Sequence, residues 1–299
     1  MTAQTGDGLR RWPIERPTTP REAYRWCEQY ARRHDENFTV VSFLLPKKLR
    51  RHFFAVYAFC RYTDDLGDEA EGDRLALLDS WEQDLRDAVG GNPRRPLLIA
   101  LARTIERKEI PLDPFLRLIE ANRMDQRVSR FATYEDVLTY CSYSATPVGQ
   151  MVLAVLGYTD AERVALSDQT CIGLQLANFW QDVSVDIEKG RIYLPLEDLQ
   201  RFGVDEQQII DRRFDERYRE LMKFEVARAR ACFAEGKKLE PRVSRSVRTD
   251  IRLYRLGGEA ILNAIEAAGY DTLSARPRVT KAVKARLAVV NGARIAMGI

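Results

Sequence analysis

The chain has 299 residues, of which 45% are apolar and 30% are charged, a balance typical of globular proteins that bury a large core. Its 47 Lys and Arg residues and 44 Asp and Glu residues leave a net charge of +3. Because a nucleic-acid binder would carry a large basic excess, we expect no nucleic-acid partner. The five cysteines lack close spacing and the only histidines are His34 and His52, which argues against a disulfide framework, a CxxC zinc site or a histidine relay.

The N-terminal residues 1–17 are polar and contain glycines and prolines, so we expect a flexible leader followed by one domain over residues 18–299. From there, apolar residues recur at three- and four-residue spacing without any alternating strand pattern. This periodicity predicts helices over residues 20–33, 48–66, 73–89, 95–107, 112–127, 134–157, 160–187, 214–239, 246–268 and 278–290. The expected fold class is all-α.

No apolar run approaches the roughly 18–20 residues that a membrane-spanning helix requires, and the leader lacks the apolar core of a signal peptide. Together with the cysteine usage, these features favour a cytoplasmic protein. Peripheral contact with the inner face of a membrane stays open.

A first acidic cluster lies at the end of the predicted helix 48–66, in the run from Tyr57 to Glu69. Asp64 and Asp68 are four residues apart and therefore share a helix face. Two carboxylates near a helix C-terminus repel each other and oppose the helix dipole, and a bound Mg²⁺ would offset both costs. The alternative is a solvated acidic helix end, but the preceding residues are apolar.

A second cluster lies in the predicted helix 160–187, where Asn178, Asp182 and Asp186 follow one another at four-residue steps. Three oxygen ligands therefore line one face of that helix, although a polar stripe on an amphipathic helix is the alternative. If the two stripes face each other, they can hold Mg²⁺ ions that clamp a diphosphate. Arg61 and Arg191 lie beside the stripes and would add guanidinium contacts to the same phosphates.

The chain resembles the squalene/phytoene synthase family from about residue 20 to about residue 285. The resemblance rests on Tyr57-x-Phe59-x-Arg61-x-x-Asp64-Asp65-x-x-Asp68-Glu69, Asn178-x-x-x-Asp182-x-x-x-Asp186, Gly190-Arg191-Ile192-Tyr193-Leu194-Pro195, and the stretches Tyr140–Gly149 and Leu256–Leu262. It implies a single-domain isoprenoid synthase fold, a helical bundle around a large central cavity. It also implies Mg²⁺ as cofactor and prenyl diphosphates as substrates.

The same resemblance implies roles for individual residues. The metal ligands would be Asp64, Asp68, Asn178, Asp182 and Asp186, and the catalytic residues would be Asp64, Asp68, Asp182, Tyr140 and Arg61. The substrate-binding residues would be Phe38, Ser42, Tyr57, Arg61, Tyr140, Asn178, Gln181, Arg191 and Tyr193.

Asp35-Glu36-Asn37-Phe38, Ser42, Leu44-Leu45-Pro46, Ser144–Gly149 and Phe179–Asp182 are similar to bacterial hydroxysqualene synthases of the hopanoid pathway. These lyases convert presqualene diphosphate and water to hydroxysqualene and diphosphate. A sister enzyme forms presqualene diphosphate from two farnesyl diphosphates, which leaves open a handover between enzymes of the squalene pathway.

One departure from the family pattern concerns the second stripe. Most condensing members carry Arg and Glu where this chain has Gln181 and Val185, so a cation is missing from the diphosphate region. No Gly-rich dinucleotide fingerprint is present either, which disfavours reduction to squalene. The alternatives are a condensing prenyltransferase that makes presqualene diphosphate, squalene or phytoene, and a non-catalytic helical scaffold.

An apolar, aromatic cavity would protect the carbocation that forms when the diphosphate leaves. Candidate lining residues are Phe38, Phe54, Tyr57, Phe179 and Trp180, although core packing explains each of them equally simply. Water would be oriented by Ser42, by Tyr140 or by the released diphosphate, and the sequence does not choose among them. We expect structural rather than catalytic roles for the two histidines.

Overall fold

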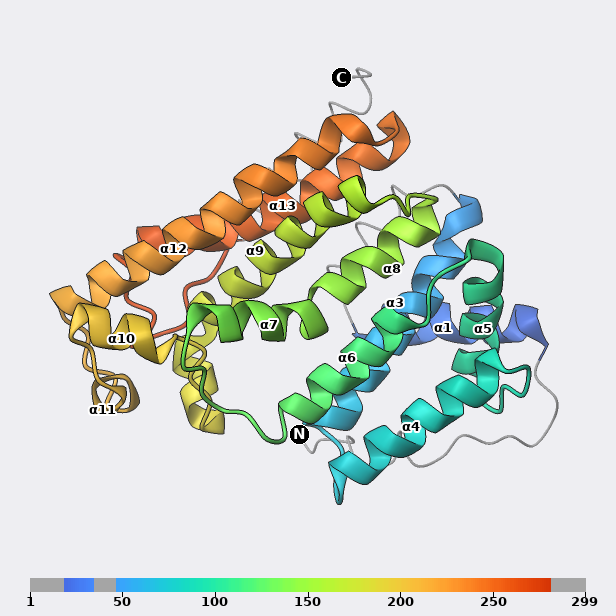
Figure 1. Ribbon diagram of the computed structural model, residues 1–299, viewed down its shortest axis with the longest axis horizontal. Coiled ribbons are helices and arrows are strands. Elements are labelled where there is room, and N and C mark those ends of the chain that lie inside the picture. Colours follow the sequence, from blue (N-terminus) through green and yellow to red (C-terminus); the bar gives the residue numbers. More distant parts are fainter. Residues whose placement is uncertain (1–18, 35–46, 281–299) are drawn as a thin grey trace. The chain divides into compact units, whose positions relative to one another are not determined.

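The computed structural model describes residues 19–34 and 47–280. All regular elements in these two ranges are helices (Figure 1), which confirms the predicted all-α class. The described residues pack as two compact units, which fall within Met1–Arg127 with Pro147–Thr159 and within Val128–Thr146 with Asp160–Ile299. The expected leader lies outside the described residues, and the single domain with its central cavity stays a prediction. None of the described helices is long and apolar enough to cross a membrane.

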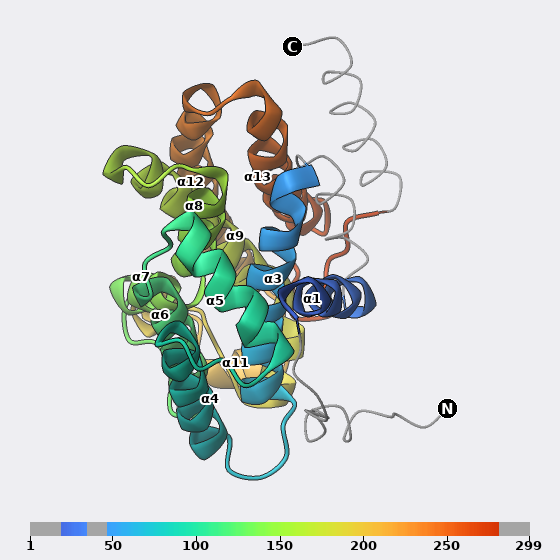
Figure 2. The same ribbon diagram turned by 90° about the vertical axis from the view of Figure 1, so that its right-hand side faces the viewer.

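The first unit is organised around one central helix. It contains α1 (Pro20–His34), α3 (Lys47–Asp68), α4 (Arg74–Val89), α5 (Pro96–Lys108), α6 (Asp113–Met124) and nearly all of α8 (Thr146–Leu156). Helix α3 contacts α1, α4, α5 and α6, and Figure 2 shows α1 almost end-on beside it. The α3 residue Phe59 stacks on Trp81 with 5.6 Å between ring centroids. The Trp81 indole N–H donates to Thr63 Oγ1 at 2.9 Å, so the buried face of α3 is closed by packing and a hydrogen bond.

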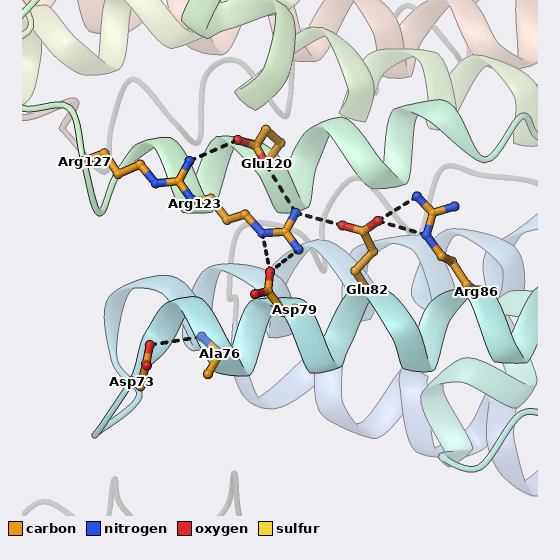
Figure 3. A network of polar contacts seen from close by, with 8 residues as sticks. All are labelled: Asp73, Ala76, Asp79, Glu82, Arg86, Glu120, Arg123 and Arg127. Atoms are coloured by element: carbon orange, nitrogen blue, oxygen red, sulfur yellow. Dashed lines mark hydrogen bonds and ion pairs between the residues drawn. The ribbon is translucent and has the colours of Figure 1, made fainter.

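Helices α4 and α6 are joined by a network of ion pairs on the surface of this unit (Figure 3). Arg123 of α6 contacts Asp79 at 2.7 Å and Glu82 at 2.8 Å on α4, and also Glu120 at 3.2 Å. The Arg123 side chain is only 12% exposed. The network therefore fixes α6 beside α4, and α6 in turn contacts the acidic end of α3.

The second unit is built on the long helix α9 (Ala161–Asp186), which contacts both α12 (Glu216–Gly236) and α13 (Arg245–Ala267). Figure 1 shows the three helices running alongside one another. The ring of Phe233 on α12 lies where a side chain at Gly173 or Gly258 would stand. Because both positions are glycine, the three helices can approach closely. The remaining elements are α7 (Tyr134–Ser144), η1 (Ile187–Lys189), α10 (Leu196–Phe202), α11 (Glu206–Ile210) and η2 (Lys237–Arg242).

The predicted helix 134–157 is wrong as one element, because α7 ends at Ser144 and α8 starts at Thr146. Pro147 has no backbone N–H to donate to the carbonyl of Tyr143 four residues earlier, so the helical ladder is interrupted there. The short helices α10 and α11 were not predicted. Of the predicted helix 278–290, residues 278–280 are not helical and the rest lies outside the described residues.

The ion-pair network predicts the effect of an Arg123→Ala substitution. Because three carboxylates would lose a largely buried partner, we expect the free energy of unfolding to fall by about 2 kcal/mol. Urea denaturation would measure the change. The matched control is Lys238→Ala, which removes an exposed pair with Glu235 at 2.6 Å and should cost less than about 0.5 kcal/mol. Equal losses in the two variants would contradict a special role for the network.

Candidate functional site

The first acidic stripe occupies the last turns of α3. Asp64 and Asp68 are exposed, whereas Asp65 between them is buried. Asp65 accepts a hydrogen bond from the Tyr30 hydroxyl at 2.6 Å and lies 2.7 Å from the guanidinium of Arg61. Asp65 therefore points inward to a structural partner. Asp64 and Asp68 lie along one face of the helix, as the four-residue spacing predicts.

Asp64 carries its charge in an unfavourable setting. Although the Asp64 side chain reaches solvent, the protein around its carboxyl group limits hydration, and the repulsion from Asp68 adds to this effect, so the pKa of Asp64 rises to about 7. Its carboxylate accepts a hydrogen bond from Asn122 Nδ2 on α6 at a long 3.4 Å. A metal cation bound close to Asp64 would lower this pKa.

Two polar residues that sequence reasoning missed support the first stripe, Asn122 in α6 and Gln126 two residues after the end of α6. Asn122 packs against Gly67 so closely that a side-chain carbon at position 67 would overlap its amide. Gln126 Nε2 donates to the Gly67 carbonyl at 3.0 Å. No sequence signal marked these residues, because their role depends on the contact between α3 and α6.

Arg61 lies one turn before Asp64 and is already engaged by carboxylates. Besides Asp65, its guanidinium contacts Glu69 at 2.9 Å. About a third of the side chain remains exposed. The structure therefore places Arg61 next to the acidic stripe, as predicted, while its contact with a diphosphate stays a prediction.

The second acidic stripe lies near the C-terminal end of α9. Asn178 is exposed, and Asp182 and Asp186 are partly exposed, whereas Phe179 and Trp180 beside them are buried. The helix thus presents its oxygen-bearing side chains on one face and packs its aromatic residues on another. Phe179 and Trp180 belong to the packed interior, as does Phe54 in the first unit.

A segment that follows α13 crosses this stripe. Arg276 pairs with both carboxylate oxygens of Asp182, and its Nη2 atom donates to Asp182 Oδ2 at 3.0 Å. Gln181, which is 6% exposed, donates from Nε2 to the Pro277 carbonyl at 2.7 Å. Its Oε1 accepts a bond from Arg276 at 3.3 Å. The Gln181 amide therefore holds the segment that carries the counter-ion of Asp182.

Tyr140 and Tyr193 lie in an aromatic cluster of the second unit. The Tyr193 ring stacks on Phe179 with centroids 3.8 Å apart and planes 9° apart. Tyr140 is buried, and its ring centroid lies 6.0 Å from that of Tyr193 and 5.9 Å from that of Phe179. Because Phe179 is adjacent to Asn178 in α9, the cluster brings both predicted tyrosines next to the second stripe.

The loop between the second stripe and α10 is fixed by backbone contacts. Gly190 adopts a φ of 74°, which glycine accepts without strain. The Arg191 N–H donates to the Asp186 carbonyl, and the Ile192 N–H donates to the Ser129 carbonyl. The Arg130 guanidinium donates to the Gly190 carbonyl at 2.7 Å. Arg191 and Tyr193 are thus placed close to the end of α9, as the motif predicted.

The remaining predicted site residues divide into two groups. Tyr57 is half-buried against the core of the first unit, and Phe38 and Ser42 lie outside the described residues. The two stripes belong to different units, so their facing each other stays a prediction. Among the described residues, no group of three or more His, Cys, Asp or Glu side chains is arranged to hold a metal.

The hydrogen bond from the Gln181 side chain to the Pro277 carbonyl can be tested without a substrate. A Gln181→Leu substitution removes a buried hydrogen bond, which typically contributes about 1 kcal/mol. We therefore expect tryptic cleavage after the exposed Arg278 to become about fivefold faster, while the exposed Gln200→Leu control stays at the wild-type rate. An unchanged cleavage rate in Gln181→Leu would show that this amide does not hold the segment.

Comparison with known proteins supports the motifs. The family model described as Squalene/phytoene synthase matches residues 31–283. The 15-cis-phytoene synthase of Synechocystis sp. is 35% identical over 272 residues, covering 86% of this chain and 81% of its own length. The phytoene synthase of Arthrospira platensis is 34% identical over 286 residues, covering 88% and 90%.

Two solved structures are similar to this one. The squalene synthase HpnC of Alicyclobacillus acidocaldarius is 48% identical with a TM-score of 0.82, covering 87% of this chain and 97% of its own. A dehydrosqualene synthase in complex with a ligand is 25% identical with a TM-score of 0.84, covering 93% and 98%. These matches confirm the isoprenoid synthase fold. The chain belongs to the squalene/phytoene synthase family, an enzyme family that acts on prenyl diphosphates.

Proposed function

We propose that this protein is a hydroxysqualene synthase, a lyase that converts presqualene diphosphate and water to hydroxysqualene and diphosphate with Mg²⁺, in squalene and hopanoid biosynthesis. The observation that carries the proposal is the state of position 181. The residue there is a neutral glutamine whose amide is committed to the Pro277 carbonyl, so it supplies no charge to a second diphosphate. The 48% identity to a squalene synthase named HpnC agrees with this subgroup.

The side chains of both stripes fit Mg²⁺. All five are oxygen donors, which this hard cation prefers, and it usually takes only one or two carboxylates together with waters and substrate phosphates. Burial and the repulsion from Asp68 raise the pKa of Asp64 in spite of the nearby Arg61, so its carboxylate would gain from a bound cation. Asp64 and Asp68 would hold metal on α3, and Asn178, Asp182 and Asp186 would hold it on α9.

The chain's own residues then assist the loss of diphosphate. Bound Mg²⁺ supplies positive charge that stabilises the leaving group. Arg61 and Arg191 add guanidinium contacts, which suit phosphate oxygens because of their planar fork. Arg276 must release Asp182 before that carboxylate can serve a metal, and the freed guanidinium is then available to an anion.

The alcohol requires one water to reach the cation after ionisation. No strong base is needed, because a carbocation is attacked readily by water. Of the two side chains that could orient this water, Tyr140 lies within the described residues and Ser42 does not. The Tyr140 side chain belongs to the aromatic cluster beside Asn178. Aromatic faces such as that of Tyr193 stabilise a nearby positive charge.

A condensing reaction is the second candidate, and the curated relatives favour it. The Synechocystis sp. and Arthrospira platensis relatives, which align over most of their own length, are phytoene synthases. In this alternative, the chain joins two prenyl diphosphates head to head and acts as a prenyltransferase.

Product analysis separates these functions. The purified protein would be incubated with Mg²⁺ and either presqualene diphosphate or farnesyl diphosphate, with and without NADPH. We expect a C30 alcohol from presqualene diphosphate alone. Presqualene diphosphate formed from farnesyl diphosphate would identify a condensing enzyme, a hydrocarbon that requires NADPH would identify squalene synthase, and no turnover of either substrate would support a scaffold.

Substitution of the stripe residues tests the metal sites. Asp64→Asn and Asp182→Asn each remove one charge that would bind Mg²⁺ where the leaving group develops, and we expect turnover to fall by at least about a hundredfold. Circular dichroism should show retained helix in both. Asp87→Asn, at a half-buried position of α4, is the control and should keep wild-type turnover. Near-normal activity of Asp64→Asn would remove the first stripe from the mechanism.

The pKa of Asp64 predicts how metal binding depends on pH. Below about 7 the carboxyl is mostly protonated, and a proton competes with the metal. The apparent affinity for Mg²⁺ should therefore rise by up to about tenfold per pH unit as the pH increases towards 7, and then level off. Isothermal titration with Mg²⁺ between about pH 5.5 and pH 8.5 would measure this dependence. Asp64→Asn should lack it, whereas a wild-type affinity independent of pH would contradict the role of Asp64.

A further inference from the structure

A pocket of about 550 Å³ lies on the first unit, lined by Pro20, Arg21, Tyr24, Arg51, Arg103 and Arg107. We call this set the arginine pocket. Its walls come from the start of α1, the start of α3 and the second half of α5. Arg51 precedes Asp64 by 13 residues on α3, which corresponds to roughly 20 Å along the helix. The arginine pocket is therefore separate from the acidic stripe of the same unit.

Of the four arginines in the arginine pocket, one pairs with a carboxylate of the described residues. Arg103 pairs with Glu106 at 3.0 Å. For Arg21, Arg51 and Arg107, no carboxylate of the described residues lies within the ion-pair distance of 4.0 Å. Like charges crowded in this way repel, so an anion bound among them would be favoured.

The wall of the pocket is a buried hydrogen-bonded network. The Tyr24 hydroxyl lies 3.0 Å from Thr104 Oγ1, which lies 2.9 Å from His52 Nδ1. Thr104 and His52 are both buried. Burial, together with the nearby charges of Arg51, Lys108 and Arg107, lowers the pKa of His52 to about 4. The histidine is therefore neutral at physiological pH and adds no further positive charge.

The wall also orients one of the guanidinium groups. Arg51 lies over the Tyr24 ring, with 5.3 Å between its central carbon and the ring centroid. This stacking restricts the Arg51 side chain before any ligand binds. A pre-oriented guanidinium loses less conformational freedom when it binds an anion.

We propose that the arginine pocket binds a phosphate group. Guanidinium groups bind phosphate oxygens in pairs, and four arginines around one pocket offer several such forks, with Glu106 as the one carboxylate of the described residues paired with any of them. The phosphate can belong to a soluble diphosphate or to the headgroup of an anionic phospholipid. This site is independent of the proposed function, because none of its residues belongs to either acidic stripe.

Two binding measurements test the site and separate the two sources. Titration calorimetry with inorganic pyrophosphate in EDTA measures the soluble ligand without metal at the acidic stripes. Sedimentation with phosphatidylglycerol vesicles, compared with phosphatidylcholine vesicles, measures the lipid. Each is carried out on the wild type, on Arg51→Gln/Arg107→Gln, and on the control Arg86→Gln/Arg94→Gln, which removes the same charge from α4 and the following loop.

We expect the wild type and the control to bind at least one probe, and the Arg51→Gln/Arg107→Gln variant to bind it at least about tenfold more weakly. Loss of pyrophosphate binding alone identifies a soluble ligand, and loss of phosphatidylglycerol binding alone identifies a lipid headgroup. Arg51→Lys/Arg107→Lys keeps the charge without the fork and should bind with intermediate affinity. Absent binding of both probes, or equal weakening in the control, would overturn the proposal.

Discussion

Both acidic stripes are governed by one electrostatic cost. Carboxylates that lie four residues apart on a helix repel each other, and the other faces of these helices are packed. Each helix reduces this repulsion in its own way. On α3, Asp65 turns inward to Tyr30 and Arg61, and Asp64 keeps a raised pKa. On α9, Arg276 neutralises Asp182. A divalent cation bound at the stripes would lower the pKa of Asp64 and would take the place of the Arg276 guanidinium at Asp182.

The packing around these helices explains why the carboxylates remain in place. Helix α3 is enclosed by four neighbours, and the absence of a side chain at Gly67 lets Asn122 approach the acidic face. Helix α9 is held by α12 and α13, where Gly173 and Gly258 admit the Phe233 ring. Rigid helices hold charged ligands at fixed positions, which a site that stabilises a leaving diphosphate requires.

Helical periodicity predicted the fold class and the helices that carry both stripes, because it is a local, repeated signal. The family was predicted from the resemblance of the motifs and not from periodicity or spacing. The break between α7 and α8 was missed, although Pro147 is a local signal for it. Asn122 and Arg276 could not be found, because they reach the stripes from segments distant in sequence. The structural roles of Trp180 and Phe54 were equally undecided, since periodicity cannot distinguish a packed aromatic residue from one that lines a cavity.

The central claim is that the bond between carbon and the diphosphate oxygen breaks, and that water then captures the carbon. Turnover of presqualene diphosphate in ¹⁸O-labelled water, followed by mass spectrometry of both products, tests this claim most directly. The account predicts one labelled oxygen in the C30 alcohol and none in the released diphosphate. Label in a phosphate product with an unlabelled alcohol would show cleavage between phosphorus and oxygen, and would contradict ionisation at the acidic stripes.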